Sequence, residues 1–335
     1  MGDLTERLPT SPAPASLRAA GTSGVVTIRQ DPWPTAGELD NPSRWQQYAE
    51  FTWPACRPLV VGSQGCATFT DPTTDKPWSP GGRSVVDNLR PFQIEAQLEC
   101  TLPIIPEPGD GDGQSSLVAD VSAALERGLI PQVATELWSG VVARAALDDG
   151  DTSYNGNRWL TRSDYGDVVS GAGLVEINDE DSPVPLVGAI GLLEQYLSCC
   201  SDVGRGVIHI PPALIGPLAS EGTSLAPPTS GGSRFTASGH ALVADCGYTG
   251  YGPDGDDGPT LPPDGVMWIY ATGPLFIHYS TMTPIGSYEE VMAMFAEYNN
   301  TVALAPAEAV VIWGCCHAAV AVDVSEFGLT LNPGS

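Results

Sequence analysis

The segment 114–146 constrains the fold more than any other part of the chain, because its apolar residues recur at three- and four-residue steps over a long distance. That spacing places them on one face of a helix, which needs a partner surface along most of its length. Ser115 or Ser116 can cap the start, and Gly150 can follow the end. Pro131 has no amide hydrogen for the helix, so we expect a kink or split there. The apolar stripe contains Leu117, Val121, Ala124, Leu125, Ile130, Val133, Ala134, Leu137, Trp138, Val141, Val142 and Ala145.

Charge and composition narrow the class of protein. Only 16% of the 335 residues are charged, against about 25% in typical domains, and 38 glycines with 31 prolines indicate many turns around a real core. The net charge of −26 repels nucleic acid phosphates, which argues against a protein that reads DNA or RNA sequence. An acidic inner face would still suit a container for DNA.

The cysteines and the apolar runs indicate the cellular compartment in which the protein is made. Eight cysteines in a chain this long do not make a disulfide scaffold, so we expect them to be reduced and mostly buried. The first residues contain no apolar run for secretion, and the longest apolar run, residues 309–322, is shorter than the about 20 residues needed to span a bilayer. We therefore expect a soluble protein that is made in the cytoplasm and does not enter a membrane.

The first third of the chain has little sustained periodicity. Residues 1–50 are rich in proline, serine, threonine, glycine and alanine, which predicts an arm that cannot fold alone. Residues 51–113 predict a long two-stranded hairpin with a proline- and glycine-rich tip, and within them residues 92–100 alternate apolar and polar side chains like a half-buried strand. An isolated hairpin is marginal in water, so it needs a neighbour to lie on.

The remainder mixes helices and strands without regular alternation, which predicts an α+β fold. The loop 247–263 is too rich in glycine, proline and aspartate for us to expect it to pack. We expect helices at 187–200 and 288–299, strands at 206–210, 241–244, 266–271 and 275–279, and an apolar strand pair within 307–323.

No motif for catalysis or cofactor binding is present. The chain has no phosphate-cradling, dinucleotide-binding or esterase motif, and its four histidines stand singly. Cys315, Cys316 and His317 lack the second ligand pair of a zinc site, so we interpret them as buried structural residues. The aspartate- and glycine-rich runs 110–113 and 254–258 lack the ligand spacing of a calcium loop, which favours solvated turns. We expect no enzyme, no cofactor and no metal site.

The order of these segments resembles the major capsid protein of tailed bacteriophages, whose fold encapsulin shells share. The resemblance covers residues 50–325 and is greatest to actinobacterial phages. It rests on the order of elements and on the segments 127–140 (RGLIPQVATELWSG), 189–195 (AIGLLEQ), 205–209 (RGVIH), 238–243 (SGHALV), 270–275 (YATGPL) and 299–308 (NNTVALAPAE).

This resemblance implies a phage major capsid fold in five parts. They are an N-terminal arm (1–50), an extended loop hairpin (51–113), a peripheral domain with the spine helix (114–186), an axial domain (187–284), and a return to the peripheral domain (285–335). The loop 247–263 would lie near the axial tip, where its acids repel across a symmetry axis or share cations. The arm is short for a fused scaffolding segment, so a separate scaffold protein, or none, would follow.

The implied function is self-assembly into an icosahedral head shell around packaged double-stranded DNA. The partners would be copies of the chain in hexamers and pentamers, the portal, a scaffold or decoration protein where one is used, and DNA bound without sequence specificity. Two alternatives stay open. One is another virion component, such as a head decoration or tail protein, and the other is an acidic hydrolase, which the missing signal segment and motifs disfavour.

The resemblance also raises the question of whether a covalent bond links neighbouring subunits. Some members of the family join a hairpin lysine to a neighbour's asparagine, and here Lys76 is the only lysine, with Asn299 and Asn300 in the returning segment. Asp75 stands beside Lys76 and favours its charged form, which is a poor nucleophile. We therefore expect a surface salt bridge at Lys76, worth at most about 1 kcal/mol, rather than an isopeptide bond.

Overall fold

The computed structural model describes nine segments of the chain, and they form an α+β fold, as predicted. Helices and strands are mixed without regular βαβ units, in two main sheets and one small strand pair. The described residues are 26–30, 90–100, 112–164, 173–200, 205–220, 234–255, 258–281, 301–313 and 316–329.

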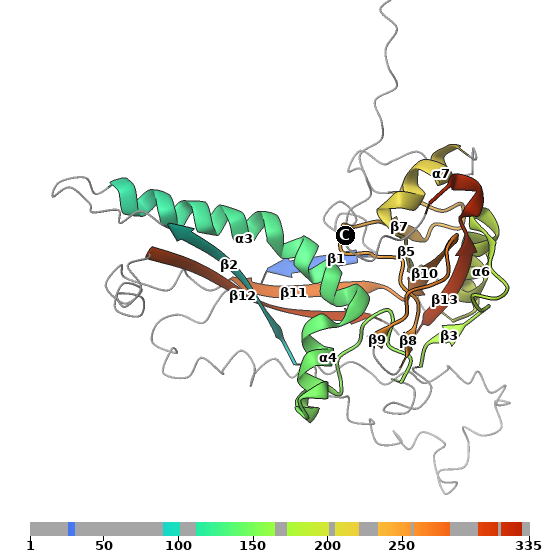
Figure 1. The fold of residues 1–335 in the computed structure, drawn as a ribbon, viewed down its shortest axis with the longest axis horizontal. Coiled ribbons are helices and arrows are strands. Elements are labelled where there is room, and N and C mark those ends of the chain that lie inside the picture. Colours follow the sequence, from blue (N-terminus) through green and yellow to red (C-terminus); the bar gives the residue numbers. More distant parts are fainter. Residues whose placement is uncertain are drawn as a thin grey trace, which may run out of the picture.

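The first sheet is long, has four strands and is covered by one helix. The strand order is β1-β11-β12-β2, with β1 parallel to β11 and the other neighbours antiparallel. Helix α3 lies along this sheet, and together they extend from the rest of the molecule (Figure 1). The bounds are β1 Val26–Gln30, β2 Phe92–Cys100, α3 Asp112–Ser139, β11 Leu275–Thr281 and β12 Thr301–Trp313.

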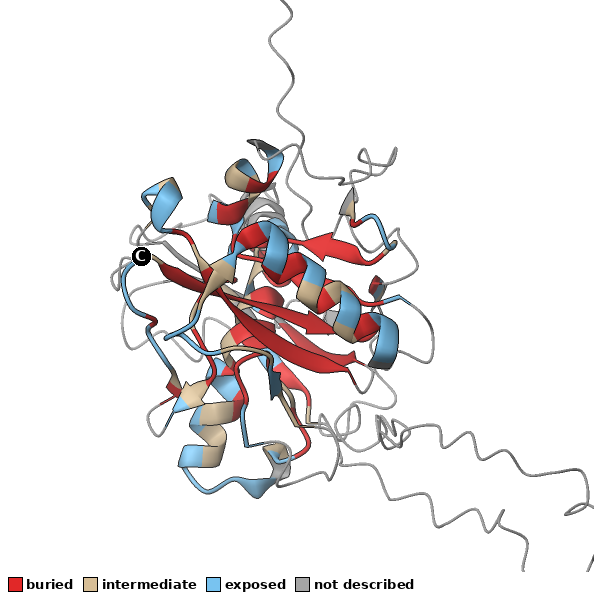
Figure 2. Cartoon of the chain, turned by 90° about the vertical axis from the view of Figure 1, so that its right-hand side faces the viewer, coloured by how far each residue is buried: buried red, intermediate tan, exposed pale blue. Residues whose placement is uncertain are grey.

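The second sheet has seven strands in a compact unit. Its order is β3-β13-β10-β5-β7-β6, and β4 also pairs with β13. Helix α6 lies across one face of it, with its buried side toward the strands (Figure 2). The bounds are β3 Val175–Glu176, β4 Val184–Pro185, α6 Leu186–Cys200, β5 Val207–His209, α7 Ile215–Ser220, β6 Arg234–Phe235, β7 Ala241–Val243, β10 Val266–Thr272 and β13 His317–Asp323.

The chain crosses between the two sheets twice, in opposite directions. Strand β10 lies in the second sheet and β11 in the first, with only residues 273–274 between them, and β12 and β13 make the same crossing in the opposite direction. The expected strand pair in 307–323 therefore consists of two strands that do not pair with each other. Strand β11, before residue 284, lies in the first sheet, and β13, after it, lies in the second.

Two apolar cores lie on opposite faces of the second sheet, and the first sheet shares one of them. One cluster joins α3 to the first sheet and to one face of the second, and the other fills the space between α6, α7 and the opposite face. Between Val121 and Trp138 the predicted helical stripe is buried except at the half-buried Ala124, but Val141 and Val142 are exposed by 47% and 38%. This part of the prediction is wrong because the helix is split at Gly140, rather than at Pro131, and α4 (Val141–Asp148) follows a new direction. The helix also begins at Asp112, before the predicted serine caps.

Three further expectations need correction. The arm contains β1, whose Val26 is completely buried in the first core, so it contributes to the fold of the subunit. The loop 247–263 packs, since Tyr248 and Pro253 are buried and β8 (Asp254–Gly255) pairs with β9 (Gly258–Pro259). The expectation of reduced cysteines is wrong for Cys316, which forms a disulfide bond; Cys199 and Cys246 are free, as predicted, but are exposed rather than buried.

Other expectations are confirmed or lie outside the described residues. Strand β2 has the predicted bounds, with Phe92 and Ile94 buried and Gln93 exposed between them. The helix predicted at 187–200 is α6. The predicted helix at 288–299 and most of the hairpin lie outside the described residues. Among the described helices, none is both long and apolar enough to cross a membrane.

Replacing Trp138 by alanine tests the packing of α3 on the second sheet. Trp138 is completely buried, so the variant leaves a large cavity, and we expect a loss of about 3–5 kcal/mol in the free energy of unfolding. Denaturant unfolding of the unassembled subunit measures it. Val141→Ala, a truncation at an exposed position three residues away, should cost less than about 1 kcal/mol. Equal losses in the two variants would contradict the packing described.

Candidate functional site

Helix α3 meets the second sheet at a junction of aromatic side chains, and Trp138 belongs to it. The indole ring is 5.0 Å from the ring of Tyr248 and 5.0 Å from that of Tyr270, measured between centroids. The Tyr270 hydroxyl donates to the carbonyl of Tyr251 at 3.0 Å. Offset and edge-to-face aromatic pairs of this kind stabilise beyond the apolar area that they bury. The contact fixes the helix against strand β10.

The split between α3 and α4 is stabilised by a buried carboxylate. Glu136, in the last turn of α3, accepts hydrogen bonds from the backbone N–H groups of Val142 and Ala143 at 2.7 and 3.0 Å. Burial raises the pKa of the Glu136 carboxyl, and the two backbone donors act in the opposite direction. Gly140 adopts a φ of 57°, and a Cβ there would overlap Trp159. The Glu136 side chain therefore caps α4 from the preceding helix.

Residues 151–164, which we term the junction loop, satisfy the end of α3. The backbone N–H groups of Leu160 and Thr161 donate to the carbonyls of Leu137 and Trp138, which have no partner within the helix. Arg162 is almost completely buried and lies over the ring of Trp159 at 4.6 Å. It forms an ion pair with the exposed Asp164 at 2.7 Å. The loop is therefore held by hydrogen bonds and by a buried guanidinium.

Two buried histidines lie where the chain crosses between the sheets. The Nε2–H of His317 donates to the carbonyl of Leu160 at 2.9 Å. In His209, Nε2 contacts the Thr272 hydroxyl and Nδ1 contacts the Tyr248 hydroxyl, each at 2.9 Å. The Thr272 hydroxyl donates to Gly273, so it accepts from Nε2–H, and Nδ1 accepts from Tyr248. Burial lowers the pKa of both imidazoles to about 3, so both are neutral.

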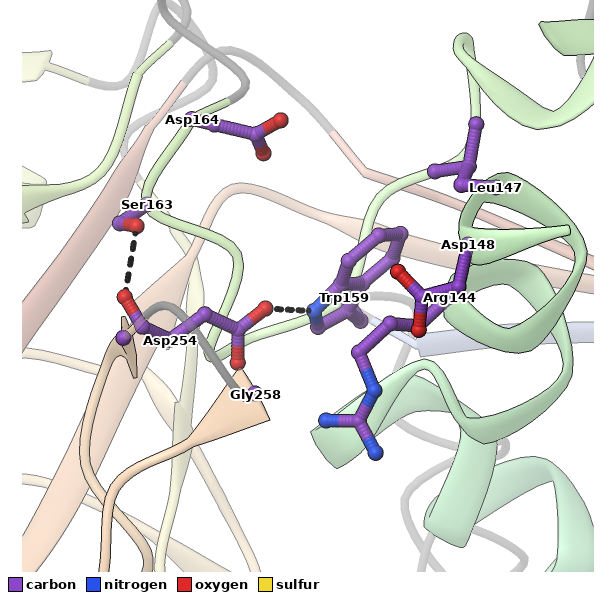
Figure 3. Close-up of a pocket in the computed structure, with 9 residues that line it drawn as sticks. Arg144, Leu147, Asp148, Trp159, Ser163, Asp164, Asp254 and Gly258 are labelled. Atoms are coloured by element: carbon purple, nitrogen blue, oxygen red, sulfur yellow. Dashed lines mark hydrogen bonds between the residues drawn. The ribbon is translucent and has the colours of Figure 1, made fainter. Parts of the chain in front are cut away.

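A pocket of about 480 Å³ opens beside the junction. Helix α4 supplies Arg144, Leu147 and Asp148 to one wall, and the opposite wall carries Asp254 and Ser163 (Figure 3). The Trp159 Nε1–H donates to the Asp254 carboxylate at 2.6 Å, and the Ser163 hydroxyl donates to the Asp254 carbonyl at 2.9 Å. Burial raises the pKa of Asp254. The interpretation of residue 254 as part of a solvated turn is therefore wrong, since its side chain holds the junction loop.

These groups are arranged for support rather than for catalysis. The ring nitrogens of His209 contact only the two hydroxyls, and Nε2 of His317 donates to a carbonyl, so neither imidazole is oriented as a general base beside a nucleophile. Burial raises the pKa of the Cys246 thiol, which disfavours the reactive thiolate. Within the described segments, no group of three His, Cys, Asp or Glu side chains could hold a metal ion.

Only some of the residues identified from the sequence lie at the junction. Cys316 and His317 are buried at the crossing, as predicted. Lys76, Asn299 and Asn300 lie outside the described residues, so the crosslink remains untested. Sequence reasoning missed Glu136, Asn157 and Arg162, whose roles arise from contacts that no local pattern shows. The signal that could have indicated them is a set of charged or amide side chains next to an apolar stripe.

Comparison with known proteins gives only distant likenesses. No family model matches the chain, and no curated protein matches it. The fold is similar to a capsid structure of cyanophage P-SCSP1u, with a TM-score of 0.40, 10% identity, and 95% of this chain and 91% of that chain covered. It is also similar to an encapsulin complex from Synechococcus elongatus, with a TM-score of 0.38, 14% identity, and 87% and 91% covered. A structure from Gordonia phage Cozz has a TM-score of 0.34, 15% identity, and 69% and 70% covered.

The low pKa values of the two histidines predict acid sensitivity. Both stay neutral in the folded protein and take up a proton in the unfolded chain, so stability is full above pH 6.5 and falls as the pH drops toward 3. Each histidine contributes a slope of about 1.4 kcal/mol per pH unit within that window. The variant His317→Gln keeps an amide donor for the Leu160 carbonyl but does not titrate. Urea unfolding between pH 6 and 4 should show a shallower slope for it by about that amount, and parallel curves would contradict the assignment.

The capping role of Glu136 predicts a local cost when it is lost. Glu136→Ala leaves two backbone N–H groups at the start of α4 without their acceptor, so we expect a loss of about 1–3 kcal/mol in the free energy of unfolding. The matched control is Gln132→Ala, an exposed position one turn earlier on α3. Guanidinium unfolding compares the two, and an unchanged midpoint for Glu136→Ala would show that α4 needs no cap from α3.

Proposed function

We propose that this chain is the major capsid protein of a tailed bacteriophage, which self-assembles into an icosahedral head shell around double-stranded DNA. The observation that carries the proposal is the shape of the subunit, which combines a 28-residue helix along an extended four-stranded sheet with a compact seven-stranded unit. The described elements that support the proposal are α3, which the resemblance takes as the spine helix, and the second sheet, whose strands follow α3 in the chain. In these terms the first sheet with α3 is the peripheral domain, and the second sheet with α6 and α7 is the axial domain.

The shape also separates the proposal from its alternatives. A decoration protein would be compact, whereas α3 and β12 extend together away from the second sheet (Figure 1). A hydrolase would need a nucleophile beside a base, and His209, His317 and Cys246 do not supply one. The partners in this proposal are copies of the same chain, the portal, and DNA held without sequence recognition. The net charge of −26 keeps DNA from adhering to the shell wall.

A short truncation of the arm tests the role of that arm in assembly. Because β1 belongs to the core, the deletion must end before Val26, and we choose residues 2–20. We expect the truncated subunit to keep the denaturant midpoint of the full chain but to sediment as small species, whereas the full chain sediments as large particles. Normal particles from the truncation would show that these residues do not join subunits.

Boiling particles in detergent tests the covalent link between subunits. We expect a single band near 35.0 kDa, because Lys76 stands beside Asp75 and is held in its charged form. A ladder of multiples that disappears in Lys76→Arg, a variant that keeps the charge, would establish an isopeptide bond and overturn this expectation. Asn299→Ala and Asn300→Ala would then identify the acceptor.

A further inference from the structure

The junction loop forms hydrogen bonds to the backbone immediately before strand β2. The side-chain oxygen of Asn157 accepts from the backbone N–H of Arg90 at 2.8 Å, and its side-chain N–H donates to the carbonyl of Arg90 at 2.7 Å. One carboxamide therefore satisfies both backbone groups of a residue 67 positions earlier in the chain. Such a two-way bond fixes the orientation of the peptide on both sides of Arg90, because donor and acceptor directions are both constrained.

Asn157 is itself held in place. Its side chain is only 7% exposed, and its backbone N–H donates to the carbonyl of Tyr154 at 2.9 Å. Its carbonyl accepts from the guanidinium of Arg162 at 2.5 Å, and the same guanidinium nitrogen donates to the carbonyl of Asn155 at 2.9 Å. Arg162 is 1% exposed. The Asn157 carboxamide is therefore held by the junction loop, which also caps the end of α3, and it cannot rotate independently of that loop.

Further contacts surround the same backbone position. The Tyr154 hydroxyl lies 3.4 Å from the carbonyl of Pro91, and the guanidinium carbon of Arg90 lies 5.7 Å from the centre of the Tyr154 ring. Pro91 is buried, and its ring fixes its own φ. These contacts hold the backbone of residues 90 and 91 in one direction where strand β2 begins.

We propose that Asn157 is a positioning residue for assembly, which sets the angle at which residues 51–89 leave the body of the subunit. The proposal rests on the proposed function, in which that segment lies on a neighbouring copy. In the proposed hairpin an extended chain would span about 3.3 Å per residue, so a small change of angle at Arg90 would displace its distant residues by many ångströms. The two hydrogen bonds between Asn157 and the Arg90 backbone therefore act on the relative tilt of adjacent subunits, and thus on the diameter of the shell.

The test compares Asn157→Ala with Asn155→Ala in the full-length chain. Asn155 is exposed in the same loop, so its variant controls for removal of an asparagine nearby. We expect Asn157→Ala to accelerate amide exchange roughly tenfold in peptides that span Arg90, with the subunit still folded. Electron microscopy should then show shells of mixed diameter, or open sheets, where the control gives shells of uniform diameter.

The outcomes separate this role from a purely structural one. A lower unfolding midpoint with unchanged shell diameters would overturn the positioning role and leave the proposed function intact. If the wild-type chain forms no shells, the positioning role falls together with the proposed function. Should Asn157→Ala fail to fold, the isosteric Asn157→Asp replaces it, because it keeps the acceptor for the Arg90 N–H and places a carboxylate oxygen against the Arg90 carbonyl in place of the donor. A mixed diameter distribution in that variant supports the proposal, and a uniform one contradicts it.

Discussion

The contact of Trp138 with Tyr248 and Tyr270 is the interaction on which the rest of the structure depends. It joins the end of α3 to the second sheet, while the first half of the same helix packs on the first sheet. Besides this contact, the sheets are coupled by the two strand crossings and by the rest of the apolar core that they share. The close approach of Gly247 to the backbone of Ala134 and Thr135 adds to the coupling, since a Cβ at that glycine would overlap both residues. The subunit can therefore behave as one body rather than as two loosely tethered parts.

Buried polar groups give this junction its specificity. Glu136, Arg162 and Asn157 each connect backbone segments that are distant in sequence or belong to different elements, and each is more than nine-tenths buried. Burying such groups is costly unless their hydrogen bonds are formed, so they favour one arrangement of α3, α4 and the junction loop over others. The neutral histidines at the crossings extend the same principle, because their partners are hydroxyls and a carbonyl that suit an uncharged ring.

The sequence predicted the elements better than their connections. The alternation at 92–100 and the helical period before Trp138 describe local geometry, and both were confirmed. The break at Gly140 was missed because the penalty of Pro131 is local, whereas the split depends on Glu136 and Trp159 in three dimensions. The pairing of β12 and β13 with 266–281 was missed because apolar runs do not specify partners. The strand in the arm was missed because five residues carry too little pattern.

The central claim is that this chain builds a closed shell, and electron microscopy of the expressed wild-type protein tests it most directly. A net charge of −26 on each copy makes association depend on salt, so the preparation should be imaged at both low and physiological ionic strength. The account predicts closed, hollow particles of uniform diameter. Particles no larger than a single 35.0 kDa chain at every salt concentration would contradict it.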